Sequence, residues 1–74
     1  MGEKTTDVKI TTATIGLDQF LKWAQVAGSG GEAKQLIQNK MVLVNGRYED
    51  KRSRQLVRGD VVEVEGRGRF RLGG

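Results

Sequence analysis

The residues of this 74-residue chain best suited to binding chemistry are its arginines and lysines, which are unevenly placed. The net charge is +4, and the four lysines before position 40 are balanced by four acidic residues. From Lys40 onward nine basic residues face five acidic ones, and seven of the nine are arginines. The guanidinium group binds phosphate through two parallel hydrogen bonds. The charge pattern therefore indicates a polyanionic partner, although a merely solvated surface would have the same composition.

Most catalytic chemistry is disfavoured by the composition. The chain has no histidine and no cysteine, so the usual general base near neutral pH, the thiolate nucleophile and the commonest transition-metal ligands are absent. Asp18 and Glu32 could form a carboxylate pair, but both are better interpreted as charges in the first turn of a helix. A domain of this size has a thin core and little room for an enclosed cleft. We expect a protein that is not an enzyme, with no cofactor, metal or small-molecule substrate.

The chain contains no apolar run that approaches 18 residues, and residues 1–10 lack the apolar stretch of a signal peptide. The missing cysteines are consistent with a reducing compartment. We therefore expect a cytoplasmic, soluble protein without a membrane partner.

One domain with a short polar tail is predicted. Residues 1–6 are interpreted as a flexible N-terminus and residues 7–72 as the domain. Apolar residues alternate with polar ones from Val8 through Ile10 to Thr12, which predicts a first strand. Apolar residues at positions 17, 20, 21 and 24 then predict a helix over 17–26, with Gly16 as its N-cap. Trp23 lies at the edge of that apolar stripe, which favours core packing over base stacking.

A second helix is predicted immediately after a glycine-rich break at 27–31. Ser29 followed by Glu32 three residues later is typical of a capping box. Apolar residues at 33, 36 and 37 should face inward, which turns Lys34 and Gln38 toward solvent on one face.

Strands are predicted after Lys40. Asn45-Gly46 between apolar segments is typical of a tight hairpin, and a charged loop should follow over residues 50–58. A turn at Gly59 precedes a strand over 61–65, and a last strand is expected over 69–72. The fold class should be α+β, with two short helices packed on a small mixed or antiparallel sheet.

These segments resemble the RNA-binding S4 domain, first known in a small-subunit ribosomal protein. The matching segments, in order, are residues 17–21 (LDQFL), 29–37 (SGGEAKQLI), 42–47 (VLVNGR) and 59–64 (GDVVEV). In that family the two helices and the following hairpin form the αL motif, which docks on folded RNA. The resemblance implies a stand-alone bacterial version, with structured ribosomal or transfer RNA, or a ribosomal particle, as partner. Double-stranded RNA is recognised by shape and phosphate position, which suits a rigid basic surface.

The resemblance carries four RNA-facing positions over to this chain: Lys34 on the second helix, Arg47 after the turn, and Lys51 and Arg52 in the loop. Gln38 is added because it shares the face of Lys34, and two further arginines because of their place in the loop. The candidate RNA-binding residues are Lys34, Gln38, Lys40, Arg47, Lys51, Arg52, Arg54 and Arg58.

The chain departs from the family at three positions. Gly16 and Gly30 stand where the family usually has arginines that contact RNA, and Lys40 stands where it has a helix-ending glycine. Lys40, Lys22 and the arginines at 67, 69 and 71 could supply replacement charge. Lys40 is also a candidate for a positive φ angle.

Two other functions fit parts of the sequence. The terminal Gly73-Gly74 resembles the end of a ubiquitin-like sulfur carrier, but such carriers usually open with a hairpin and one helix, whereas two helices are predicted here. The second alternative is a protein-interaction module for an acidic partner. We expect Gly73-Gly74 to be a flexible end without chemistry.

Overall fold

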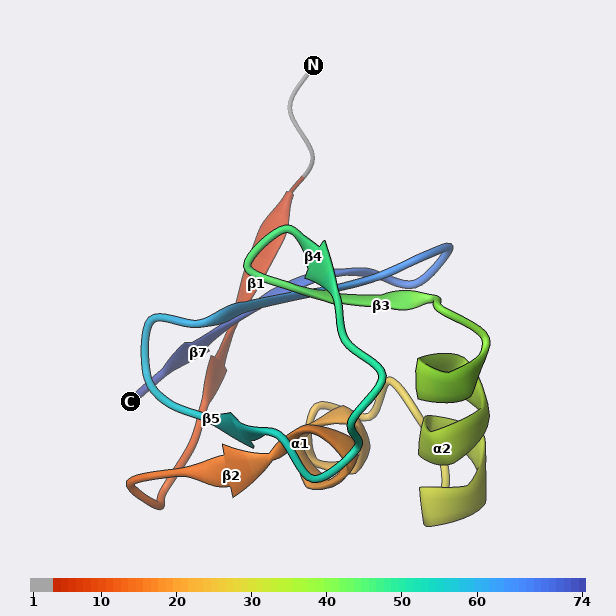
Figure 1. Cartoon of the computed structure of the whole chain (residues 1–74). Coiled ribbons are helices and arrows are strands. Elements are labelled where there is room, and N and C mark those ends of the chain that lie inside the picture. The colour runs from red at the N-terminus through yellow and green to blue at the C-terminus, as the bar shows by residue number, and fades with distance from the viewer. Residues whose placement is uncertain (1–3) are drawn as a thin grey trace.

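The computed structural model describes residues 4–74 and shows two helices packed against strands (Figure 1). The helices are α1 (Leu17–Trp23) and α2 (Gly30–Gln38). The strands are β1 (Thr5–Lys9), β2 (Ile15–Gly16), β3 (Val42–Val44), β4 (Arg47–Tyr48), β5 (Gln55–Leu56), β6 (Val61–Val64) and β7 (Gly68–Gly73). The predicted α+β class, with two short helices on a small sheet, is confirmed.

Five strands form a mixed sheet in the order β1-β7-β6-β3-β4. β1 runs parallel to β7, and the other neighbours are antiparallel. Alternate residues of the central strands face the helices, so that Val62, Val64 and Leu72 are buried with Phe20 of α1 and Ile37 of α2. Both helices lie on this side of the sheet (Figure 1). The other side of the sheet carries the polar residues of the same strands.

The predicted hairpin turn between β3 and β4 is confirmed. Asn45 and Gly46 have φ angles of 53° and 87°, which are the left-handed values that a two-residue turn of this kind needs. The Asn45 side chain also donates to Asp60 Oδ1 at 3.1 Å and accepts from the Val61 N–H at 2.9 Å. The turn is thereby tied to the start of β6.

Both helix starts follow the predictions, with one change. Gly16 is the N-cap of α1, and the Ser29 hydroxyl accepts from the Glu32 N–H at 3.1 Å. The Glu32 carboxylate, however, accepts from the Gly28 N–H at 2.6 Å, so the reciprocal half of the capping box is made one residue earlier.

α1 ends at Trp23, three residues earlier than predicted. Gln25 adopts a φ of 60°, and the next two N–H groups, of Val26 and Ala27, turn back to the Leu21 carbonyl. These bonds supply donors to a backbone carbonyl that the end of the helix would leave without a partner, and they direct Val26 into the core.

The first strand was predicted from Val8 to Thr12, but β1 spans Thr5–Lys9 because Thr5 and Thr6 pair with β7. Of the predicted N-terminal tail over residues 1–6, residues 1–3 lie outside the described part of the chain, and Thr5 and Thr6 belong to this strand.

The predicted loop over residues 50–58 contains a strand, β5, that was not predicted. β5 pairs with β2, and its Leu56 is fully buried opposite Ile15. A strand of two residues has no detectable alternation, which is why its pattern was not recognised.

The expectation of a flexible C-terminus is wrong for Gly73. This residue belongs to β7, and its carbonyl accepts from the Ile10 N–H at 2.8 Å. Within residues 4–74 no helix is long and apolar enough to cross a membrane.

Candidate nucleic-acid interface

α2 presents the first part of the candidate interface. Its buried residues, Ala33, Leu36 and Ile37, face the core. Lys34 and Gln38, one turn apart, are exposed on the opposite side, as predicted. The helix therefore offers one cation and one amide to a partner along its solvent face.

Lys40 follows the end of α2 in the left-handed conformation, with a φ of 56°. Its N–H donates to the Ile37 carbonyl, and the Met41 N–H donates to the Leu36 carbonyl. Lys40 therefore occupies the position where helices usually place glycine. The side chain is exposed beyond the last turn of the helix.

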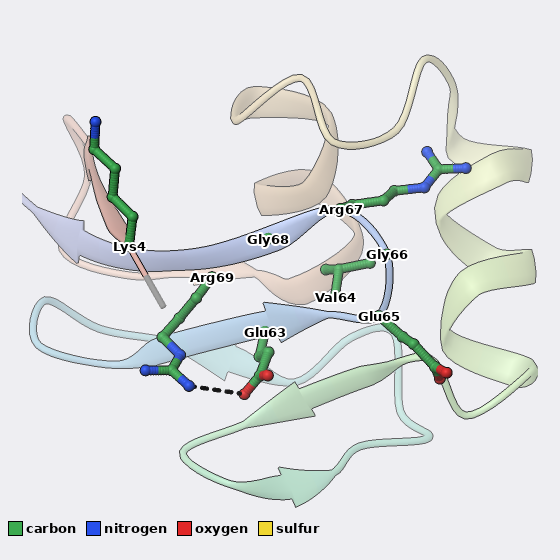
Figure 2. Close-up of a pocket in the computed structure, with 8 residues that line it drawn as sticks. All are labelled: Lys4, Glu63, Val64, Glu65, Gly66, Arg67, Gly68 and Arg69. Atoms are coloured by element: carbon green, nitrogen blue, oxygen red, sulfur yellow. Dashed lines mark ion pairs between the residues drawn. The ribbon is translucent and has the colours of Figure 1, made fainter. Parts of the chain in front are cut away.

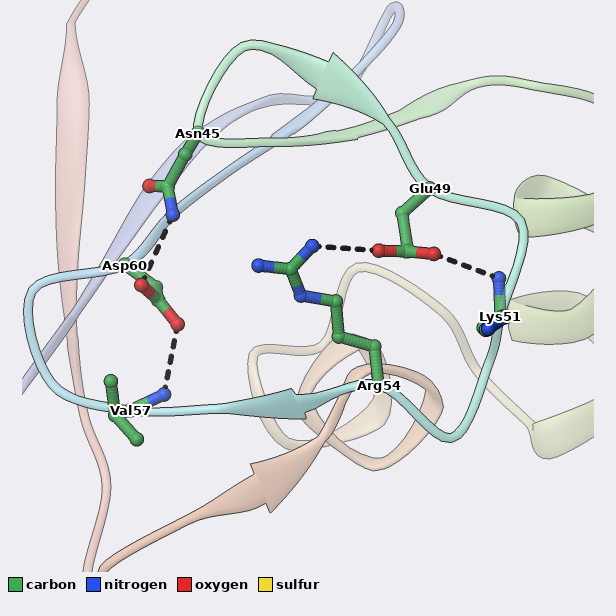
Figure 3. Close-up of polar contacts among 6 residues, drawn as sticks. All are labelled: Asn45, Glu49, Lys51, Arg54, Val57 and Asp60. Atoms are coloured by element: carbon green, nitrogen blue, oxygen red, sulfur yellow. Dashed lines mark hydrogen bonds and ion pairs between the residues drawn. The ribbon is translucent and has the colours of Figure 1, made fainter.

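The loop after β4 is fixed against the start of α1. The Leu17 N–H donates to the Arg54 carbonyl at 2.8 Å, and the Asp18 N–H donates to the Arg52 carbonyl at 3.0 Å. The loop thus satisfies two N–H groups that the first turn of a helix leaves without an intrahelical acceptor. The Arg52 backbone is held beside the N-terminus of α1. Lys51 lies on the side of the loop that is nearer to α2 in the view of Figure 3.

Glu49 organises this loop. Its carboxylate accepts from Arg54 Nη1 at 2.8 Å and from the Lys51 N–H at 3.2 Å (Figure 3). These contacts, the Arg54 guanidinium foremost, hold the pKa of Glu49 below its ordinary value. Arg54, a candidate for RNA contact, thus has its charge compensated inside the protein.

Arg47 and Arg58 lie at different places. Arg47 is exposed on the edge strand β4 and pairs with Val44, so it shares the sheet face that the helices cover. Arg58 donates from Nη2 to the Ile10 carbonyl at 3.1 Å. It precedes the turn between β5 and β6, which lies on the opposite side of the molecule from α2 (Figure 1). The structure does not bring Arg58 together with the α2 residues.

The last three arginines each have a carboxylate beside them, although their side chains are partly exposed. Arg67 reaches toward α2 (Figure 2). Its Nη1 donates to the Val26 carbonyl, in the turn before α2, at 2.7 Å and to Glu32 of α2 at 2.9 Å. Arg69 lies 3.7 Å from Glu63 (Figure 2), and the Arg71 Nε lies 2.9 Å from Asp7. None of these pairs was predicted, because the partners lie in different elements.

Glu32 joins the two helices to the sheet. The Gly28 N–H first, and then the Arg67 guanidinium, hold the pKa of this carboxyl below its ordinary value. Arg67 therefore fixes the turn between α1 and α2, and no local pattern of residues indicates this role.

A distinction among the cations follows from these contacts. Five of the candidate RNA-binding cations are exposed and form neither an ion pair nor a side-chain hydrogen bond with any described residue, whereas Arg54 is bound by Glu49 and Arg58 by the Ile10 carbonyl. We call these five residues and Gln38 the basic surface: Lys34, Gln38, Lys40, Arg47, Lys51 and Arg52. Across residues 4–74 there is also no group of three or more acidic, histidine or cysteine side chains placed to hold a metal ion.

Comparison with known proteins agrees with this architecture. Residues 8–71 match the S4 domain family. The chain is also 48% identical over 65 residues to the "Probable ribosome maturation protein RlbA" of Bacillus subtilis (strain 168). That similarity covers 88% of this chain and 92% of the relative. The chain therefore belongs to the S4 domain family.

Proposed function

We propose that this protein is a non-catalytic RNA-binding protein that recognises structured RNA through the basic surface and acts in the maturation of the ribosome. Membership of the S4 domain family and the name of the Bacillus subtilis relative support the proposal. Ribosomal RNA is the favoured target, with transfer RNA second, and a cytoplasmic setting follows from such a partner.

The observation that carries the proposal is a contrast between two groups of cations. Arg54, Arg67, Arg69 and Arg71 are matched by carboxylates. The cations of the basic surface have no such partner among the described residues and remain available for phosphate. Neutralising RNA phosphates releases their counterions, which makes cations of this kind a source of binding free energy.

The rigidity of this surface suits recognition of shape. The loop that carries Lys51 and Arg52 is fixed to α1 and by Glu49, and the turn before Arg47 is tied to β6. Fixed cations can match the phosphate spacing of a folded RNA with little loss of entropy on binding.

The test is binding to ribosomal RNA fragments at increasing salt, measured by fluorescence anisotropy of labelled RNA. If about four phosphates are contacted, the slope of log K against log salt should be about −3. Lys34→Glu and Arg52→Glu should weaken binding and make the slope shallower. Each should leave the unfolding free energy within about 0.5 kcal/mol of wild type, because both side chains are exposed.

Lys4→Glu, an equal charge change outside the basic surface, is the matched control. Equal losses of binding in the control and in the two test variants would show a diffuse polycation rather than a site. A flat salt dependence, or a preference for an acidic protein over RNA, would overturn the proposed function.

The alternative of a sulfur carrier finds no support in the C-terminus. A carrier presents a free diglycine to an activating enzyme, whereas Gly73 is paired within β7. A C-terminal thiocarboxylate detected by intact mass would revive this alternative.

A further inference from the structure

Trp23 is the only tryptophan of the chain, and its environment differs from the prediction of core packing. At the end of α1 it is 53% exposed. Its indole Nε1–H donates to the Lys9 carbonyl at 2.8 Å. This bond satisfies the one polar atom of the ring and fixes the edge of the ring on β1. An oriented aromatic surface therefore faces solvent.

The neighbours of Trp23 on the surface are cationic. Gln19, Lys22 and Trp23 are exposed and share one face of α1, because they are three and four residues apart. Lys9, whose carbonyl holds the indole, is exposed as well. Neither lysine forms an ion pair within the described chain. Positive charge beside an aromatic ring favours a nucleic acid over an apolar or basic partner.

α1 begins beside the basic surface. The Asp18 N–H holds the Arg52 backbone at the start of the helix. Trp23 lies five residues further along, which is about 7.5 Å at the helical rise of about 1.5 Å per residue. RNA bound at Arg52 could therefore extend along α1 to the indole without leaving the protein surface.

We propose that Trp23 is a stacking platform for an unpaired base of the bound RNA, with Lys22 and Lys9 contacting the phosphates beside that base. The inference rests on the proposed function and narrows its target to a helix with an unpaired nucleotide at its side or end. A fully paired duplex offers no free base face for the ring, whereas bulges and loops do.

The test compares two RNA duplexes of equal length, each annealed from two strands so that neither has a loop, one fully paired and one with a two-nucleotide bulge. Because Trp23 is the sole tryptophan, its fluorescence reports directly on the site. The bulged duplex should quench this fluorescence more strongly than the paired duplex. Trp23→Leu should lower affinity for the bulged duplex at least about fivefold, the lower end of base–aromatic stacking, and leave affinity for the paired duplex unaffected. Trp23→Phe, which keeps a ring, should lose less.

Tyr48→Leu is the matched control. Tyr48 is 62% exposed and pairs with Leu43, on the sheet face away from the helices. Its replacement should leave both affinities unchanged, and thermal melts should show each variant folded. Equal losses of affinity for both duplexes in Trp23→Leu would make Trp23 a structural residue, and no loss for either would refute stacking. Equal quenching by the two duplexes refutes stacking even if the variants do not fold. Each of these results would leave salt-dependent RNA binding, and with it the proposed function, intact. A wild-type protein that does not bind RNA would refute the proposed function itself.

Discussion

Replacing Lys40 by glycine should stabilise the fold and weaken RNA binding at the same time. Lys40 has a φ of 56°, and the left-handed region costs a residue with a side chain about 1–2 kcal/mol. Glycine avoids that cost but loses about 0.5–1 kcal/mol through its greater freedom in the unfolded chain. The net gain should be about 0.5–1 kcal/mol, or roughly 2–8 °C in Tm for a domain of this size.

The effect on RNA should have the opposite sign. Lys40→Gly removes one unpaired cation of the basic surface, so the slope of log K against log salt should become shallower by about 0.7–0.9. Thermal unfolding and salt titrations of RNA binding, done on the same preparation, measure the two changes. Their opposite directions would indicate that lysine at this position serves binding at the expense of stability.

Gln25→Gly provides the matched control. Gln25 ends α1 as Lys40 ends α2, with a φ of 60°, but it carries no charge. Gln25→Gly should raise Tm by a similar amount and leave the slope of log K against log salt unchanged. A lower Tm for Lys40→Gly, or identical RNA binding by the two variants across the salt range, would refute the reasoning.

Three further predictions concern stability. Leu56→Ala should cost about 2–5 kcal/mol in urea unfolding, because the side chain is fully buried; a loss below about 1 kcal/mol would mean that β5 is not part of the core. Glu49→Ala should cost about 1–2 kcal/mol by leaving Arg54 without its charged acceptor, and an unchanged midpoint would contradict this. Folding keeps the pKa values of Glu32 and Glu49 below the ordinary value of 4.5, so their contribution is present above that pH and is lost as pH falls toward the folded-state values. The urea concentration at the unfolding midpoint should therefore fall as the pH is lowered below about 4.5, and it should fall less steeply in Glu49→Gln.

The features that could be predicted from the sequence are those set by a few neighbouring residues. Asn45-Gly46 specifies its turn because both residues tolerate positive φ, and Ser29 specifies the start of α2 through its own hydroxyl. The outward direction of Lys34 was predictable because Ala33 and Leu36 fix the buried side of the same helix.

The features that were missed depend on residues far apart in the chain. Arg67 contacts Glu32 and Val26, which lie 35 and 41 residues away, and no local spacing indicates such pairs. The apolar stripe of α1 suggested burial of Trp23, but Phe20 and Leu21 take the buried side of the last turn and Trp23 lies on its exposed side. Charge counts likewise could not separate Arg54, held by Glu49, from the unpaired Arg52.

The parallel pairing of β1 with β7 has a consequence for how the chain folds. Thr5 pairs with Arg69, 64 residues later, and closing a loop of that length costs roughly 4 kcal/mol of chain entropy. The helices and the β3–β4 hairpin involve much shorter separations and can form while synthesis continues. β1 cannot pair with the sheet until β7 has been synthesised, so β1 remains unpaired during most of synthesis. Completion of this fold is therefore a late event, set by the emergence of β7.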